Sequence, residues 1–107
     1  MNNTRRRFEI LLPLQFNDGD DIPDDLIADA VSEVVAHFGA ASYQNDVIEG
    51  HWTDSEVVYH DKLSKIVVDV LDTKENQRWM SDYKARWKEK LEQLDLWVVS
   101  FTVNIES

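Results

Sequence analysis

The sequence predicts an α+β protein with the order βαββαβ, folded as a ferredoxin-like sandwich. In this fold a four-stranded antiparallel sheet carries two helices on one face. Three observations predict it: strand-like segments that alternate between apolar and polar residues, two segments with helical periodicity, and a central hairpin between them. The 107 residues suit one domain, so we expect residues 1–107 to form a single unit, with residues 1–7 flexible.

The first half of the chain predicts a strand followed by a helix. Residues 8–16 alternate between apolar and polar side chains, as a strand with one buried face does. Pro13 has no N–H to donate, which indicates an edge position or a bulge. Residues 17–21 are turn-forming, and apolar residues at helical spacing then predict a helix that ends at Phe38, before Gly39.

The second half predicts a hairpin, a long helix and a last strand. Residues 47–59 form the hairpin, and its second arm continues as the third strand. Residues 72–94 predict the helix, with Asp72 and Glu75 close to a capping box at its start. Its buried stripe is predicted to be Trp79, Tyr83, Trp87, Leu91 and Leu94. Residues 96–105 alternate again and predict the last strand.

Strand alternation also predicts which side chains lie on the open face of the sheet, away from the helices. We expect Gly50 and Trp52 to face the core, and Trp97 to face it on the last strand. The open face is then predicted to carry Glu9, Leu11, Pro13, Gln15, Glu49, His51, Lys65, Val67, Asp69, Leu96, Val98, Ser100 and Thr102. A half-apolar sheet face predicts an interface. We expect a homodimer with Leu11, Val67 and Val98 near its centre.

The charge balance excludes several partners. The net charge is −10, and the only basic residues before Lys62 are Arg5, Arg6 and Arg7. Nucleic acids and anionic membranes need a cationic footprint, so we expect neither, whereas a basic protein partner is allowed. The sequence has no Cys and no stretch of transmembrane length, and we expect a cytoplasmic protein.

His51 is the best candidate for chemistry on the predicted open face. A histidine beside Glu49 or Asp69 suits a general base, and Lys65 and Tyr59 would complete a pocket around it. The plainer interpretation is a surface histidine in a solvated ladder of ion pairs, which has no bearing on catalysis.

The remaining acidic and histidine motifs do not predict a metal or a cofactor. The aspartates of residues 17–25 resemble a calcium loop in charge only, because the glycine and the closing glutamate are misplaced. His60 and Asp61 are neighbours without a third ligand at a recognisable spacing. The sequence has no glycine-rich phosphate loop and no nucleophile elbow.

Several stretches together resemble a family of small uncharacterised bacterial proteins with a ferredoxin-like fold. The stretches are residues 8–14, 16–19, 23–29, 38–40, 50–52, 58–61, 68–73 and 94–97, which include the Gly50-His51-Trp52 hairpin motif. The resemblance covers nearly the whole chain. It implies the fold and a bacterial, single-domain context, and no catalytic residue.

Three functions follow as hypotheses. The first is an interaction domain without enzymatic activity, self-associating through the open sheet face. The second is a small-molecule enzyme or ligand-binding protein of the dimeric α+β barrel type, with its pocket around His51. The third is an acidic inhibitor or immunity-type protein that masks a basic partner, based on the charge of −10. A closed pocket favours the second hypothesis, and a flat dry face favours the first.

Overall fold

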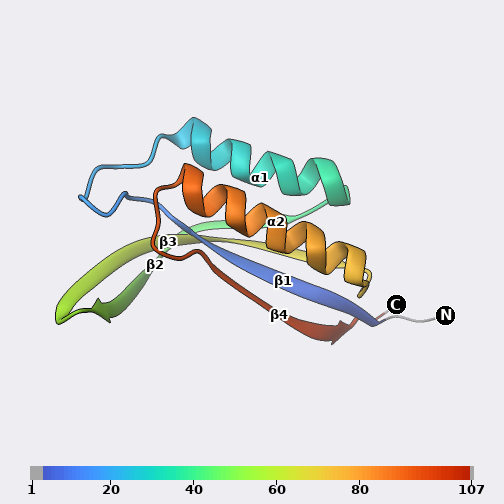
Figure 1. Cartoon of the computed structure of the whole chain (residues 1–107). Helices are drawn as coiled ribbons and strands as arrows, with labels where there is room; N and C mark the ends of the chain where they lie inside the picture. Colours follow the sequence, from blue (N-terminus) through green and yellow to red (C-terminus); the bar gives the residue numbers. More distant parts are fainter. Residues whose placement is uncertain (1–3, 107) are drawn as a thin grey trace.

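Two helices lie on the same side of an antiparallel sheet (Figure 1). The computed structural model describes residues 4–106, apart from the side chains of residues 46–48, 59 and 60. The elements are β1 (Thr4–Pro13), α1 (Asp24–Phe38), β2 (Ser42–Asp54), β3 (Val57–Val70), α2 (Lys74–Lys90) and β4 (Trp97–Asn104). Neither helix within residues 4–106 is long and apolar enough to cross a bilayer. The prediction of an α+β protein with two helices and an antiparallel sheet is confirmed.

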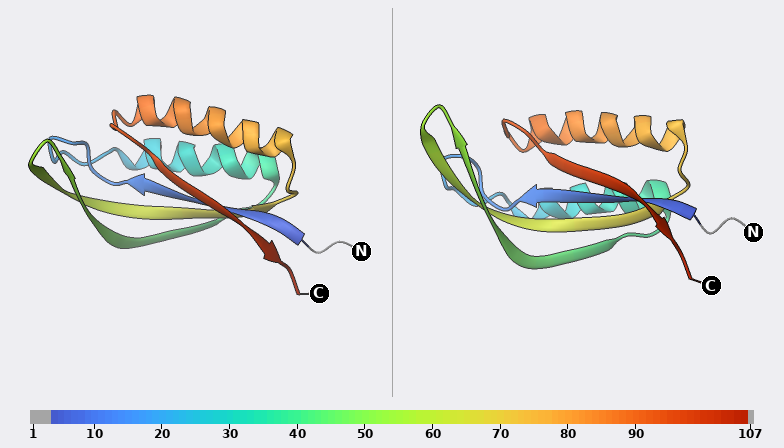
Figure 2. Two further views of the ribbon diagram at one scale, coloured as in Figure 1. Left: turned by 60° about the horizontal axis from the view of Figure 1, so that its bottom comes forward. Right: turned by 90° about the horizontal axis from the view of Figure 1, so that it is seen from below.

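The sheet has the strand order β2-β3-β1-β4, with every neighbouring pair antiparallel. It is curled: the β2–β3 hairpin extends beyond the helices and bends (Figure 2). A register shift in β2 between Gln44 and Ile48 lies within this hairpin. Between these two positions β2 has two more residues than β3, and extra residues on one strand bend that strand and increase its twist, which accounts for part of the curl.

Residues 4–7 belong to a strand, and residues 1–3 lie outside the described part of the chain. Residues 1–7 were expected to be flexible, yet β1 begins at Thr4 and pairs with both β3 and β4. Arg6 and Arg7 add ion pairs to Asp72 and Asp69, each at 2.8 Å. Arg6 and Arg7 therefore belong to the central strand, and each has a carboxylate partner on a neighbouring segment.

Pro13 lies at the end of a central strand, and not at the sheet edge or in a bulge. The pairing of β1 with β4 stops at Leu11, whereas the pairing with β3 continues to Pro13 opposite Leu63. The next residue, Leu14, donates its N–H to the carbonyl oxygen of Lys62 at 2.8 Å. A proline is tolerated here because β4 has already ended on that side.

The core lies between the helices and the sheet. Tyr83 and Trp87 of α2 are buried against Phe8, Ile10 and Leu12 of β1, as the periodicity predicts. The core residues are Phe8, Ile10, Leu12, Ile22, Ile27, Ala30, Val34, Ile66, Val68, Val70, Met80, Tyr83, Trp87, Leu91 and Leu96. Burial raises the pKa of the Tyr83 hydroxyl far above its ordinary value.

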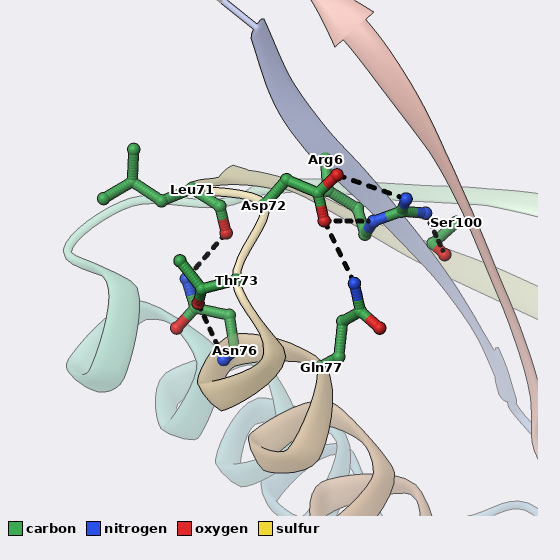
Figure 3. A network of polar contacts seen from close by, with 7 residues as sticks. All are labelled: Arg6, Leu71, Asp72, Thr73, Asn76, Gln77 and Ser100. Carbon is green, nitrogen blue, oxygen red and sulfur yellow. Dashed lines mark hydrogen bonds and ion pairs between the residues drawn. The ribbon is translucent and has the colours of Figure 1, made fainter.

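The cap of α2 differs from the predicted capping box. Thr73 is the N-cap, and its side-chain oxygen accepts the backbone N–H of Asn76 at 3.1 Å (Figure 3). Asp72 was expected to cap the helix together with Glu75. It instead accepts hydrogen bonds from the guanidinium of Arg6, and these lower its pKa. The arginine competes for the carboxylate because β1 passes beside the start of α2.

The other end of α2 comes earlier than predicted. The helix ends at Lys90, and Glu92 has a left-handed φ of 54°. This conformation turns the chain away from the helix axis. Leu91 stays buried, but Leu94 lies in the following loop with 55% of its surface exposed. The expectation that Leu94 belongs to the buried stripe is therefore wrong.

Candidate functional site

The two faces of β4 are the reverse of those predicted. The register pairs Leu11 with Trp97, and Ile10 with Val98. Ile10 is buried beneath the helices, so Val98 shares the helix-covered side and Trp97 shares the open side with Leu11. Leu96, which is 1% exposed, anchors this arrangement in the core. The more apolar set of β4, with Trp97, Val99 and Phe101, lies on the open side, so assigning the more apolar set to the core is wrong here.

The outer half of β2 is also reversed. Gly50 pairs with Asp61, which lies on the open side, so Gly50 and Trp52 lie on that side as well. Glu49 and His51 alternate to the opposite side. The register shift between Gln44 and Ile48 does not change this alternation: it adds two residues to β2, and Gln44 and Gly50 both pair with residues of the open side.

These two reversals build an apolar groove at one end of the open face. Its volume is about 490 Å³, within the range of small-molecule sites. Four strands and the loop after α2 contribute to it. The lining residues are Leu11, Pro13, Gly50, His51, Trp52, Asp61, Leu63, Gln93, Leu94, Asp95 and Trp97. This set contains two tryptophans and two carboxylates, but neither lysine nor arginine.

Trp52 and Asp61 hold each other in place within the groove. The indole Nε1–H of Trp52 donates to Asp61 Oδ2 at 2.5 Å across the hairpin. Gly50 packs closely against Leu63, another residue of the groove. A Cβ atom on Gly50 would lie 3.2 Å from Leu63 Cδ1, which is tighter than an ordinary contact. The glycine therefore keeps the floor open, and the indole fixes the orientation of the carboxylate.

The loop after α2 closes the opposite side of the groove. Asp95 Oδ1 accepts the backbone N–H of Leu96 at 2.9 Å and lies 3.4 Å from Lys84 Nζ. The buried Leu96 thus attaches the loop to the core. Leu94 and Trp97, on either side of this anchor, remain exposed and line the groove.

The predicted site residues are divided between two places. His51 Nε2 lies 3.5 Å from Glu49 Oε1, and both side chains are more than half exposed. Lys65 and Asp69 lie on the open face, on the other side of the sheet from that pair. The structure therefore brings Glu49 and His51 together and separates them from Lys65 and Asp69, although His51 also contributes to the lining of the groove. The side chain of Tyr59 is outside the described residues.

The predicted dimer face is divided in the same way. Leu11 and Val67 both lie on the open face, since Glu9 pairs with Val67 and Leu11 lies two residues along the strand. Val98 lies on the helix-covered side, for the reason given above. The homodimer itself stays a prediction.

The groove residues missed at the level of sequence are Trp52, Asp61, Leu94 and Trp97. Large apolar side chains were assigned to the core, which is their usual place. The signal that was available is Gly50, because a glycine within a strand marks a site where another group approaches closely.

Histidine and carboxylate side chains do not converge on a metal site in the described part of the chain. No group of three or more His, Cys, Asp or Glu side chains within residues 4–106 is arranged to hold an ion. The chemistry of the groove is thus that of aromatic rings and single carboxylates.

Comparison with known proteins identifies structural neighbours of the same fold. No protein-family model matches the chain, and no curated protein matches it. A phage SAM lyase in complex with S-methyl-5′-thioadenosine matches with a TM-score of 0.69 and 15% identity, over 99% of this chain and 93% of that one. A phage SAM lyase in the apo state matches with a TM-score of 0.66 and 14% identity, over 100% and 94%. These matches establish a shared fold.

The neighbours correct the leading functional expectation. An interaction domain without enzymatic activity was favoured, because no catalytic signature stood out in the sequence. The two solved structures named above are instead structures of an enzyme, one of them with a small nucleoside bound. The alternative, a small-molecule enzyme, is therefore the better-supported interpretation.

Proposed function

We propose that this protein is a small-molecule enzyme that binds S-adenosylmethionine (SAM) in the open-face groove and releases S-methyl-5′-thioadenosine from it. The observation that carries the proposal is the lining of the groove, with two tryptophans, two carboxylates and neither lysine nor arginine. SAM has a flat adenine ring and a positive sulfonium. Indole faces stack on flat rings and attract cations.

Asp61 is the residue proposed to meet the positive part of the ligand. Trp52 occupies its Oδ2, and among the described side chains its Oδ1 accepts no hydrogen bond. The carboxylate therefore has an oxygen available for a ribose hydroxyl or for the field of the sulfonium. The hydrogen bond from the indole orients that oxygen in advance, which lowers the cost of ordering on binding.

The proposed reaction needs no co-reactant. The bond between sulfur and the four-carbon chain breaks, the electron pair stays on sulfur, and the sulfonium becomes a neutral thioether. As that bond breaks, the carboxylate of the four-carbon chain forms a bond to the carbon that leaves sulfur and closes a lactone, so that no free carbocation forms. Positive charge disappears from sulfur along this path, and an apolar groove that excludes water favours such a loss of charge.

The charge of the whole chain supports a cationic ligand. The net charge is −10, which raises the local concentration of a small cation around the protein. We also propose that the strand order β2-β3-β1-β4 classes the domain with ferredoxin-like folds, with the curled hairpin as the elaboration that forms the groove.

Release of S-methyl-5′-thioadenosine tests the function. The full chain is incubated with SAM, and the product is measured by liquid chromatography against the spontaneous decay of SAM in buffer. Wild type should exceed that decay. Asp61→Asn should lose about tenfold or more, because a contact to a charged group is worth about 1.5–3 kcal/mol.

Asp29→Asn is the matched control for this experiment. Asp29 is exposed on α1, away from the groove, so this variant removes one charge without touching the site. It should retain wild-type rates. A wild-type protein that neither accelerates product release nor binds SAM would refute the proposed function.

A further inference from the structure

A second cluster of charged side chains lies beside the groove on the same open face. It occupies the middle of the sheet, where β1 and β3 pair. Two ion pairs cross between these strands: Arg7 with Asp69, and Lys65 with Glu9. They line a shallow hollow together with Val67 and the start of β2.

The two ion pairs differ in their remaining capacity to bind. Arg7 makes two hydrogen bonds to Asp69, at 2.8 and 2.9 Å, and these lower the pKa of the aspartate. These two parallel hydrogen bonds hold the guanidinium and the carboxylate in one fixed bidentate geometry. Lys65 Nζ lies 3.5 Å from Glu9 Oε1, which is too long for a strong hydrogen bond. The ammonium has three donors and the carboxylate two acceptor oxygens, so the looser pair retains sites for a ligand.

The looser pair is also the one next to the groove. Lys65 is paired with Leu11, and it lies two residues from Leu63 on the same face. Both leucines line the groove. Two residues of a strand span about 6.6 Å, which is close to the reach of the four-carbon amino-acid chain of SAM beyond its sulfur.

We propose that Lys65 and Glu9 bind the amino-acid end of the substrate, with Lys65 on its α-carboxylate and Glu9 on its α-ammonium. This inference rests on the proposed function and adds a specificity determinant to it. A ligand with an α-amino-acid group spans the groove and the charged pair. A nucleoside without that group fills the groove alone. The pair therefore distinguishes substrate from S-methyl-5′-thioadenosine, which lacks the amino acid.

An ordinary surface ion pair would be more exposed. The side chains of Lys65 and Glu9 are only 24% and 23% exposed, compared with 54% and 68% for His51 and Glu49. Partial burial between apolar neighbours weakens screening by water and strengthens the attraction of both charges for a ligand of opposite charge.

The test compares two neutral thioethers by isothermal titration calorimetry on the full chain. S-adenosylhomocysteine carries the amino-acid group, S-methyl-5′-thioadenosine does not, and neither has a sulfonium to cleave. Lys65→Met should weaken binding of S-adenosylhomocysteine about tenfold or more and leave binding of S-methyl-5′-thioadenosine within about twofold. Glu9→Gln should show the same selectivity.

Lys62→Met is the control, since Lys62 is exposed on β3 and alternates to the other side of the sheet. It should leave both affinities unchanged. If wild type binds both ligands and Lys65→Met and Glu9→Gln weaken both equally or neither, the inference is wrong and the proposed function survives. If wild type binds neither ligand, both fail together.

Discussion

Glu33 of α1 shows how a single carboxylate ties the two helices together. It accepts the indole Nε1–H of Trp87 at 2.6 Å and forms an ion pair with Arg86, which also binds Asp82 at 2.8 Å. Burial alone would raise the pKa of Glu33, but the hydrogen bonds from Arg86 and Trp87 outweigh it and lower that pKa below 4.5. The ionised form therefore stabilises the folded protein.

The lowered pKa of Glu33 predicts a defined pH dependence. A carboxylate with a depressed folded pKa contributes its stability above its unfolded pKa, near 4.5, and loses it as the pH falls toward the folded value. Glu33→Gln should thus lower the stability of the folded protein at about pH 6. At about pH 3.5 the same substitution should lower that stability by less. Urea unfolding midpoints at both values measure this.

The exposed Glu89 of α2 provides the comparison for that experiment. Glu89→Gln should leave the midpoint within a small margin at both pH values. An equal loss of stability for Glu33→Gln at low and at high pH would mean that packing, and not the charge, accounts for the role of Glu33.

At the scale of the element, the start of α2 depends on Thr73. Its hydroxyl accepts the N–H of Asn76, and the Asn76 side chain donates to the carbonyl of Leu71 at 2.9 Å (Figure 3). Thr73→Ala should lower the free energy of unfolding by about 1 kcal/mol, whereas Thr73→Ser should retain most of it. Chemical denaturation of the two variants measures the difference. Equal losses would show that the hydroxyl is not the cap.

The register of β4 is tested by a pair of tryptophans. Trp87 is 2% exposed in the core and Trp97 is 62% exposed on the open face. Trp87→Ala should therefore cost about 3–5 kcal/mol, and Trp97→Ala less than about 1 kcal/mol. Urea denaturation of both variants decides the matter. A large loss of stability on Trp97→Ala would mean that Trp97 is buried in the core and that the two faces of β4 are assigned the wrong way round.

The elements themselves were predictable because each has a strong local signal. The stripe of Tyr83 and Trp87 and the alternation in β1 correctly identified the core. The faces of β2 and β4 were not predictable. In β4 and in β2 the alternating set that contains a large apolar side chain, Trp97 or Trp52, lies on the open side and not in the core. For this reason the prediction assigned Trp52 and Trp97 to the core, although both line the groove.

At the scale of the whole molecule, the curl of the sheet creates the site. The β2–β3 hairpin bends beyond the helices (Figure 2) and carries Trp52 and Asp61 to the end of β1, where the loop after α2 also arrives. A flat sheet would leave these side chains apart. Long-range packing of this kind has no local sequence signal, and the predicted site therefore included His51, which lines the groove, without Trp52 and Asp61.

The most direct test of the proposed site is an NMR titration of the ¹⁵N-labelled chain with S-methyl-5′-thioadenosine. The chain has four tryptophans, and each indole N–H gives its own signal. Two of them, Trp52 and Trp97, line the groove, whereas Trp79 and Trp87 pack on the helix side. The signals of Trp52 and Trp97 should shift in a saturable manner while the other two stay in place. Signals that do not move at saturating ligand, or that move only for Trp79 and Trp87, would contradict the proposed site.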